Sequence, residues 1–236
     1  MPKTSKKEEA PSGFSGFADA QMKFFKALAK HQDRFWYGEH KSEFEEGWSK
    51  PMSALLGEAR AKIDGAYPDC DLEEPKVFRL HRDVRFSTDK SPYKTSVSGV
   101  IAARKGLKVT AAPAALYVQL GLENIVAAGL YMMDAEQLAR YRAAVLDEVK
   151  GAELGKIVKA LEKKGISTAG GETLKKAPRG IDPAHPRIEL LKKKGLIAVA
   201  GEIPLDLVPK KDFLGWVSTQ AKTMAPLVRW LVFATA

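Results

Sequence analysis

The sequence predicts an α+β protein with a mainly antiparallel sheet of about four to six strands. In the middle of the chain, segments with an apolar period of two follow one another through short links, and helical periods lie before and after them. Short links join antiparallel neighbours, whereas parallel strands need long crossovers. No GxGxxG, phosphate-loop or GxSxG motif occurs, which disfavours the folds that depend on these motifs. We therefore expect helices from both ends of the chain to cover the sheet.

Length and composition favour one domain. The chain has 236 residues with 45% hydrophobic and 28% charged content, which suits one large globular core. We expect residues 14–236 to form a single α+β domain and residues 1–13, rich in Lys, Glu, Ser and Pro, to form a disordered tail. The single cysteine, Cys70, excludes an internal disulfide. No apolar run approaches the roughly 18 residues of a membrane span, so we expect a cytoplasmic protein without membrane partners.

Helices are expected on both sides of the strands. Asp19 lies near the start of the first one, Asp134 and Gln137 form a capping-box pattern before another, and Gly165 follows the end of a third. An interruption is expected at 33–37, and Pro226 is expected to begin the last helix. The helical segments are 18–30, 38–48, 51–63, a segment after Asp134 with Leu138, Tyr141, Val145 and Val149 on one stripe, 153–164, a short helix from His185, 212–219 and 226–233.

The strands are expected at 76–86, 96–103, 115–120, 124–132 and 196–200, the last at an edge of the sheet. In the first of them, apolar residues alternate with charged residues, which is typical of a half-buried strand with a charged face. Arg82 lies in register with the apolar set, where an unpaired guanidinium would be costly to bury. We therefore expect a carboxylate to meet Arg82 or a bulge to turn it outward.

Residues 76–94 are the most basic part of the middle of the chain, with six Lys or Arg against two Asp, which is +4 of the chain's net charge of +9. Arginine binds carboxylate and phosphate oxygens two at a time, so a rigid strand with several arginines suits an anionic ligand. Structural ion pairs of Arg82 with Asp83 and of Arg85 with Asp89 are the alternative.

This stretch also carries a resemblance to a known family. Residues 79–86 read RLHRDVRF and residues 89–95 read DKSPYKT, and together they resemble the signature of domain-of-unknown-function family 2461, a family of conserved hypothetical proteins. The resemblance runs from about Phe14 to Leu231 and implies no particular activity. Where the family tends to carry paired asparagines, this chain has His31 and Gln32.

Site residues are expected on this strand and the loop after it. Alternation places His81 between Arg79 and Asp83 on one face, so Asp83 is a candidate to orient His81 for proton transfer. Trp36 is a candidate for stacking on a ligand, although packing in the core is the stronger interpretation. No histidine has metal-ligand spacing, and no metal or cofactor is predicted. The expected ligand-binding residues are Arg79, Arg82, Arg85, Asp89, Lys90, Tyr93, Lys94 and Trp36.

Three functions remain open. The first is an enzyme or binding protein that receives a phosphate or carboxylate group on residues 79–94. The second is a nucleic-acid-associated module that also uses residues 150–211, which carry 14 basic and 7 acidic groups. The third is a non-catalytic scaffold in which the charged strand is a ladder of internal ion pairs, with Arg82 and Asp83 as structural partners.

Overall fold

The computed structural model describes residues 13–85, 88–106, 112–169 and 171–235. Within these residues, seven strands form one antiparallel sheet in the order β1-β3-β4-β5-β7-β6, with β2 also paired to β3. The predicted α+β class is confirmed. The predicted tail lies outside the described residues, apart from Gly13. The strands are β1 (Asp71–Leu72), β2 (Lys76–Val77), β3 (Ser96–Arg104), β4 (Ala114–Gly121), β5 (Ile125–Leu130), β6 (Ser167–Ala169) and β7 (Leu196–Val199).

The first two strands, β1 and β2, act as one interrupted edge strand. Over the described ranges, the sheet therefore has seven strands instead of the expected four to six. β1 pairs with β3 at Ala103 and Arg104, and β2 pairs with the next part of β3 at Gly99 and Val100. Pro75 lies between them and has no backbone N–H to donate to a ladder.

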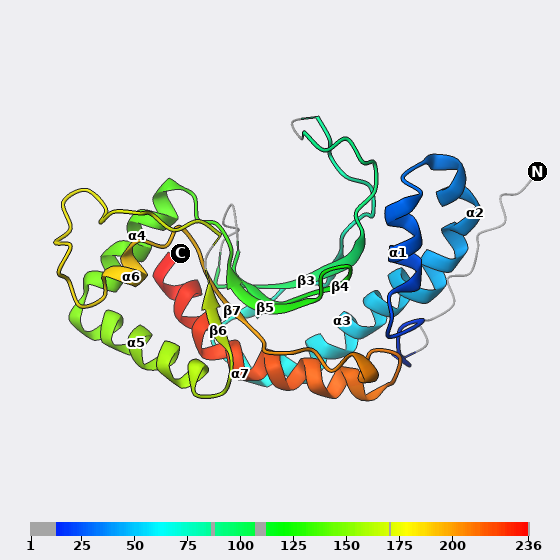
Figure 1. Ribbon diagram of the computed structural model, residues 1–236. Helices are drawn as coiled ribbons and strands as arrows, with labels where there is room; N and C mark the ends of the chain where they lie inside the picture. The colour runs from blue at the N-terminus through cyan, green and yellow to red at the C-terminus, as the bar shows by residue number, and fades with distance from the viewer. Residues whose placement is uncertain (1–12, 86–87, 107–111, 170, 236) are drawn as a thin grey trace, which may run out of the picture.

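Helices cover one face of this sheet. Figure 1 shows α3 and α7 beneath the strands, with α1 and α2 at one end of the molecule and α4, α5 and α6 at the other. The helices are α1 (Lys23–Lys30), α2 (Arg34–Phe44), a π-helical turn (Glu45–Ser49), α3 (Lys50–Ile63), α4 (Ala135–Leu146), α5 (Glu148–Glu162), α6 (Ile188–Leu191) and α7 (Asp212–Thr235). Short 3-10 turns cover Asp64–Ala66 and Leu205–Leu207.

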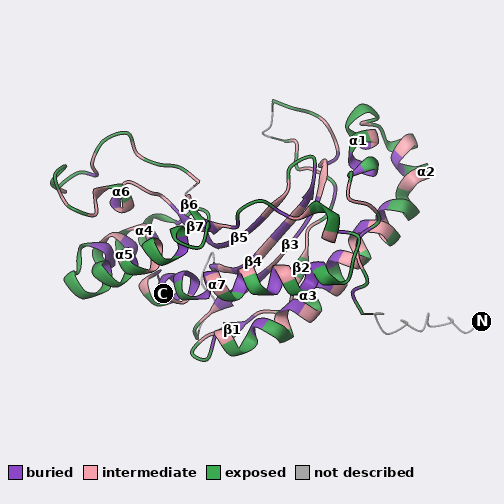
Figure 2. Cartoon of the chain, turned by 60° about the horizontal axis from the view of Figure 1, so that its bottom comes forward, coloured by how far each residue is buried: buried purple, intermediate pink, exposed green. Residues whose placement is uncertain are grey.

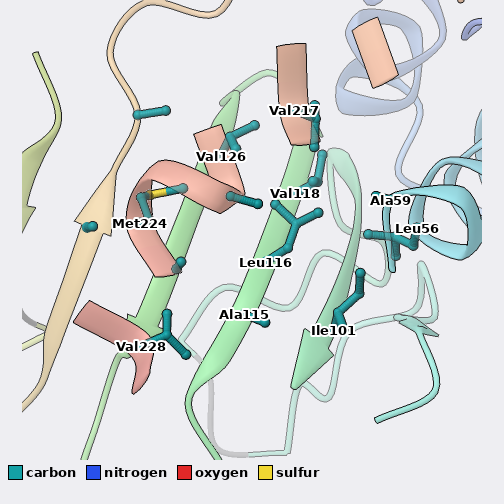
Figure 3. Close-up of a cluster of buried hydrophobic side chains, with 14 of the residues drawn as sticks. Leu56, Ala59, Ile101, Ala115, Leu116, Val118, Val126, Val217, Met224 and Val228 are labelled. Carbon is teal, nitrogen blue, oxygen red and sulfur yellow. The ribbon is translucent and has the colours of Figure 1, made fainter. Parts of the chain in front are cut away.

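The main core lies between the sheet and these two helices. Figure 3 shows apolar side chains of the central strands meeting α3 and α7. Leu116 and Val118 of β4 are fully buried, as are Leu56 of α3 and Val217 and Met224 of α7. Burying one such side chain contributes roughly 1.5–3 kcal/mol, so this layer fixes the position of the strands.

The N-terminal helices differ from their predicted bounds because of local backbone conformation. Met22 has a left-handed φ of 56°, so α1 begins at Lys23 instead of Ala18. The expected interruption at 33–37 is wrong: Asp33 caps α2 by accepting hydrogen bonds from the backbone N–H groups of Phe35 and Trp36, both at 2.9 Å. The helix then continues into α3 through the π-helical turn.

The C-terminal half contains three further differences. Residues 212–235 form the single helix α7 with Pro226 inside it, because apolar residues on both sides of the proline pack on the sheet. Val149 does not extend the stripe of α4: Asp147 ends that helix and caps α5, and Val149 is exposed. β7 is not at the edge of the sheet, since β6, which the sequence did not predict, pairs with its outer side. The capping box at Asp134 and Gln137 is confirmed.

None of the helices in the described part of the chain combines the length and hydropathy that crossing a bilayer requires.

Candidate functional site

In the part of the chain that the structure describes, one face of the sheet has no helix layer, and Gly99 shows which face it is. A Cβ atom on Gly99 would lie 2.5 Å from Cδ1 of Leu56 in α3, so Gly99 faces the helices. Because side chains alternate along a strand, Ser98 and Val100 face the opposite side. We call this side the uncovered face.

The strand register extends this assignment across the sheet. In an antiparallel pair, residues directly opposite each other share a face. Lys76 lies opposite Val100, Val100 opposite Tyr117, and Tyr117 opposite Ala127. A second row begins at Phe78, whose backbone N–H donates to the carbonyl oxygen of Ser98 at 2.9 Å. That row continues through Ser98, Gln119 and Ile125.

An apolar hollow of about 500 Å³ lies on the uncovered face. Its floor is formed by side chains of β4, β5 and β7, most of them small or branched. Gly129 has a φ of 122°, and a Cβ atom there would lie 2.4 Å from the carbonyl oxygen of Leu196, so only glycine fits between β5 and β7 at this point. The floor residues are Ala114, Tyr117, Ile125, Ala127, Gly129 and Ile197.

Two large apolar side chains border the hollow. Tyr131 and Met132 line it and are 63% and 41% exposed. Two glycines fix the backbone of Tyr131: Cβ atoms on Gly171 and Gly195 would lie 2.7 Å and 1.9 Å from its carbonyl oxygen. Exposed aromatic and thioether groups beside an apolar hollow are typical of a binding surface.

A polar group separates the hollow from the edge of the sheet. The hydroxyl of Tyr117 donates to Oε1 of Gln119 at 2.7 Å, and Nε2 of Gln119 donates to the carbonyl oxygen of Glu123 at 3.4 Å. Burial raises the pKa of Tyr117, and a side-chain hydrogen bond with Ser98 acts in the opposite direction. Tyr117 therefore stays protonated at neutral pH and offers its hydroxyl group to the hollow's inner border.

Two lysines lie beside Phe78 at the β2 edge of the same face, and Arg79 follows Phe78 directly in the chain. Nζ of Lys76 and Nζ of Lys94 lie 5.7 Å and 5.5 Å from the centre of the Phe78 ring. Burial lowers the pKa of Lys94, and the positive charge of Arg79 lowers it further. Within the described residues, Lys76, Arg79 and Lys94 form no ion pair. We call these three residues and Phe78 the basic edge.

From the basic edge, residues 78–85 and 88–94 form the two sides of an arm that rises on the uncovered side of the sheet (Figure 1). Only Lys76–Val77 of the predicted 76–86 strand is a regular strand; the two sides of the arm are then joined by an isolated bridge between His81 and Tyr93. Phe86, the predicted end of that strand, lies outside the described residues. The expected alternation is present, since Leu80 is buried and Arg79 and His81 are exposed.

The base of the arm is held against the N-terminal helices by aromatic contacts. Tyr93 is only 4% exposed, and its ring centre lies 4.6 Å from that of Tyr37 in α2. The backbone N–H of Tyr93 donates to Oε1 of Gln32 at 3.1 Å. Tyr93 was expected to face a ligand, but its ring is packed as an anchor. Gln32, which precedes α2, thus contributes to holding the arm in place.

In the outer arm, beyond the bridge between His81 and Tyr93, both arginines are neutralised by ion pairs with carboxylates of the arm itself. Arg82 pairs with Asp89, and Arg85 donates to both oxygens of Asp83 at 2.9 Å and 2.7 Å. A carboxylate thus meets Arg82, as expected, but both ion pairs have exchanged the partners suggested by the sequence. The hydrogen bonds from Arg85 lower the pKa of Asp83, and those from Ser91 and Arg82 lower the pKa of Asp89. Nζ of Lys90 donates to the carbonyl oxygen of Val84 at 3.0 Å.

The expected arrangement of His81 and Asp83 is not formed. Asp83 is bound by Arg85, while the His81 ring packs edge to face on Tyr37 and Tyr93, with ring centres 5.8 Å and 4.9 Å away. Proton transfer by a His81–Asp83 pair therefore has no geometric support in this conformation.

Trp36 packs against residues of α1, α2 and the link between them. Its ring stacks on those of His40 and His31, with centres 3.9 Å and 5.5 Å apart, and it also contacts Phe24. This arrangement agrees with packing in the core, which was the stronger interpretation of Trp36, and not with stacking on a ligand. Among the described residues, no group of three or more His, Cys, Asp or Glu side chains is arranged to hold a metal ion.

Sequence reasoning missed Lys76, Phe78 and the whole hollow as site candidates. The strand periodicity contained a signal for the hollow, because the alternate positions Ala114, Ala127 and Gly129 are small. Small residues on one side of a strand do not show whether a helix covers them, so the uncovered face became visible only with the fold.

Comparison with known proteins identifies a family and no function. No curated protein and no solved structure matches the chain. The family described as "Conserved hypothetical protein (DUF2461)" matches residues 20–230, which span most of the chain and include both the arm and the hollow. The chain therefore belongs to this family of conserved hypothetical proteins.

Proposed function

We propose that this protein binds a small ligand through a phosphate or carboxylate group at the basic edge. The observation that carries the proposal is that Lys76 and Lys94 lie beside one aromatic ring, with Arg79 close enough to lower the pKa of Lys94, and that none of the three forms an ion pair within the described residues. Three like charges repel one another, and Lys94 is also partly removed from water. An anion relieves both effects, because it offsets the repulsion and favours the charged form of the lysine.

The position of the cluster also favours ligand binding. Lys76 lies on the uncovered face in the same row as Tyr117, so an anion held there lies over the sheet. Arg79 has a planar group that matches two oxygens of a carboxylate or phosphate, and each lysine adds a mobile point charge. The residues proposed to bind the anion therefore lie at the base of the arm and not in its outer part. Two of them, Arg79 and Lys94, were among the ligand-binding residues that the sequence predicted.

A titration with inorganic phosphate at fixed ionic strength tests the proposal. Thermal unfolding is expected to shift upward and to saturate, because a ligand that binds only the folded state adds about 2.7 kcal/mol at 100 times its Kd. Arg79→Gln and Lys94→Met are each expected to weaken phosphate binding at least tenfold. Acetate provides the corresponding carboxylate measurement.

Two controls separate the basic edge from general charge effects. Lys222→Met removes one positive charge from an exposed position on α7, on the other side of the sheet, and is expected to leave phosphate binding unchanged. Arg85→Gln removes a cation from the outer arm, where Asp83 already neutralises it, and is expected to have little effect. Equal losses in all four variants would contradict a specific site.

A second candidate function, association with nucleic acid, is favoured by a different feature. A groove of about 550 Å³ between α5 and the 186–193 segment has more basic than acidic residues in its lining: Lys156, Lys159, Arg187 and Lys193 against Glu162 and Glu189. Phosphate-tracking surfaces use such basic residues, and their affinity falls steeply with salt. Binding of a single-stranded oligonucleotide that weakens strongly between 50 and 200 mM salt, and that Lys156→Met and Lys159→Met reduce, would support this function instead.

The scaffold hypothesis fits the outer arm alone. The pairs Arg82–Asp89 and Arg85–Asp83 are ion pairs within the arm, and exposed pairs of this kind contribute little to stability. We therefore assign the outer arm no ligand contact in this proposal.

A further inference from the structure

We infer that the ligand is an amphipathic anion whose flat apolar body lies in the hollow of the uncovered face while its phosphate or carboxylate is bound at the basic edge. This inference rests on the proposed function and adds the chemical class of the ligand. The two features lie on one continuous surface, since Lys76, Val100, Tyr117 and Ala127 form a single cross-strand row.

The spacing of the two features sets the length of the ligand. Lys76 is on β2 and Tyr117 is on β4, with β3 between them. Neighbouring strands are about 4.8 Å apart, so the basic edge and the near border of the hollow are about 10 Å apart at the backbone. The lysine side chains shorten this gap. A ring system carrying one phosphate or carboxylate is therefore long enough to reach both.

The shape of the hollow favours a flat body. Its floor at Ala114, Ala127 and Gly129 lacks large side chains, so the ligand meets a nearly smooth part of the sheet. Tyr131 and Met132 stand at the rim and are exposed enough to close on the ligand's edge. Aromatic and sulfur groups make favourable contacts with rings.

A purely apolar ligand does not match the charges of this surface. Lys94 is half-buried and lies 5.5 Å from the Phe78 ring, at the end of the second row. An apolar ligand would leave this ammonium group and Arg79 without a counter-charge. A ligand with both parts satisfies the cations and the hollow together.

Isothermal titration of the full chain with four probes tests the inference: inorganic phosphate, 2-naphthyl phosphate, 2-naphthoate and the neutral 2-naphthol. We expect 2-naphthyl phosphate to bind at least tenfold more tightly than inorganic phosphate. Tenfold corresponds to about 1.4 kcal/mol, or burial of roughly 55 Å² of apolar surface, which one ring supplies. We expect 2-naphthol to bind at least tenfold more weakly than the naphthyl anion that binds better. Comparing 2-naphthyl phosphate with 2-naphthoate shows which anionic group the site takes.

Two variants separate this inference from the proposal on which it rests. Ala114→Leu places a larger side chain on the hollow's floor and is expected to weaken the naphthyl anions at least tenfold while inorganic phosphate binds as before. Lys94→Met is expected to weaken both. Ser167→Leu is the matched control, because it adds bulk at an exposed position in the edge strand β6, outside the hollow.

Each contrary result has a distinct meaning. If neither inorganic phosphate nor acetate binds, the proposed anion site falls and the inference with it. If inorganic phosphate binds but 2-naphthyl phosphate and 2-naphthoate gain nothing, or Ala114→Leu leaves their affinity unchanged, the anion site stands and the amphipathic ligand is overturned. If Ala114→Leu instead changes the oligomeric state of the chain, the hollow is a contact between copies and the inference is also overturned.

Discussion

The two faces of the sheet are made by the same strands but contain different kinds of residue. On the side of α3 and α7, Ile101 and Leu116 are fully buried between the strands and the helices (Figure 3). On the opposite side, Val100 and Tyr117 are partly exposed, and Figure 2 shows intermediate burial alternating with full burial along the strands.

This difference separates stability from binding. Residues on the covered face are close-packed, so their size and shape are fixed by neighbours on two elements. Residues on the uncovered face pack only against their own sheet, so polar groups such as Gln119 are tolerated there. The uncovered face can therefore accommodate changes that affect binding without unfolding the protein.

The largest expected effect is on the covered face. Leu116→Ala removes a fully buried side chain from the layer between β4 and the helices, and we expect a loss of about 2–5 kcal/mol in the free energy of unfolding. Val100→Ala, one strand away on the uncovered face, is expected to cost less than about 1.5 kcal/mol. Urea unfolding measures both. Similar losses for the two variants would mean that the faces do not differ as described.

A smaller effect is expected where a helix approaches the sheet most closely. Gly99→Ala places a Cβ atom 2.5 Å from Leu56 and 3.0 Å from the carbonyl oxygen of Lys76, so the strand or α3 must shift. Overpacking of this kind costs typically about 1–3 kcal/mol. Gly57→Ala is the matched control, since a Cβ atom there meets nothing within 4 Å. A neutral Gly99→Ala would show that α3 is loosely packed on the sheet.

On the uncovered face, loss of the Tyr117 hydroxyl is expected to be milder. Tyr117→Phe removes the 2.7 Å hydrogen bond to Gln119, with an expected cost of about 0.5–1.5 kcal/mol. Tyr131→Phe, at an exposed ring on the hollow's rim, is expected to leave unfolding unchanged. Equal costs for the two tyrosine variants would contradict the assignment of Tyr117 to a hydrogen-bonded group.

The smallest effect concerns the titration of Lys94. Its pKa is lowered by burial and then by Arg79, so between the folded pKa and 10.5 the unfolded chain binds more protons and stability rises with pH. Below the folded pKa this contribution is constant. Arg79→Gln is expected to raise the pKa of Lys94 while leaving it below 10.5, because burial remains.

Carbon-detected NMR of the lysine ε-methylene groups measures this titration residue by residue. Arg85→Gln provides the comparison, since that arginine is not among the causes of the Lys94 shift. A Lys94 that titrates at 10.5 in the wild-type chain, or that does not respond to Arg79→Gln, would contradict the crowding of charges at the basic edge.

Much of the fold follows from local sequence signals. The period of two placed β3, β4 and β5 within one or two residues, and Asp134 with Gln137 located the start of α4. Signals that depend on distant packing failed. Pro226 was expected to begin a helix, yet α7 continues through it because Leu227 and Val228 are buried beside the sheet. The short strand β6 has three residues, too few for a periodic pattern.

The site was predictable only in part. The sequence showed where the basic stretch lies, because this follows from the charges. It also predicted that a carboxylate would meet Arg82, because alternation placed this arginine among the apolar residues. It did not give the partner of each arginine, since the partner of Arg82 is Asp89, seven residues further along the chain. Nor did it give the basic edge, because the approach of Lys76 and Lys94 to Phe78 depends on pairing between β2 and the strand that follows the arm.

The interrupted edge strand affects how this protein behaves at high concentration. An antiparallel sheet with a free, regular edge is a template on which other copies can add strands and polymerise. Here Pro75 breaks the outer edge, and Arg60 of α3 binds the carbonyl oxygens of Leu72 and Glu73 at 2.8 Å and 3.1 Å. At the opposite edge, the described residues include three that form the edge strand β6. Both edges are therefore expected to resist the addition of strands from other copies of the chain.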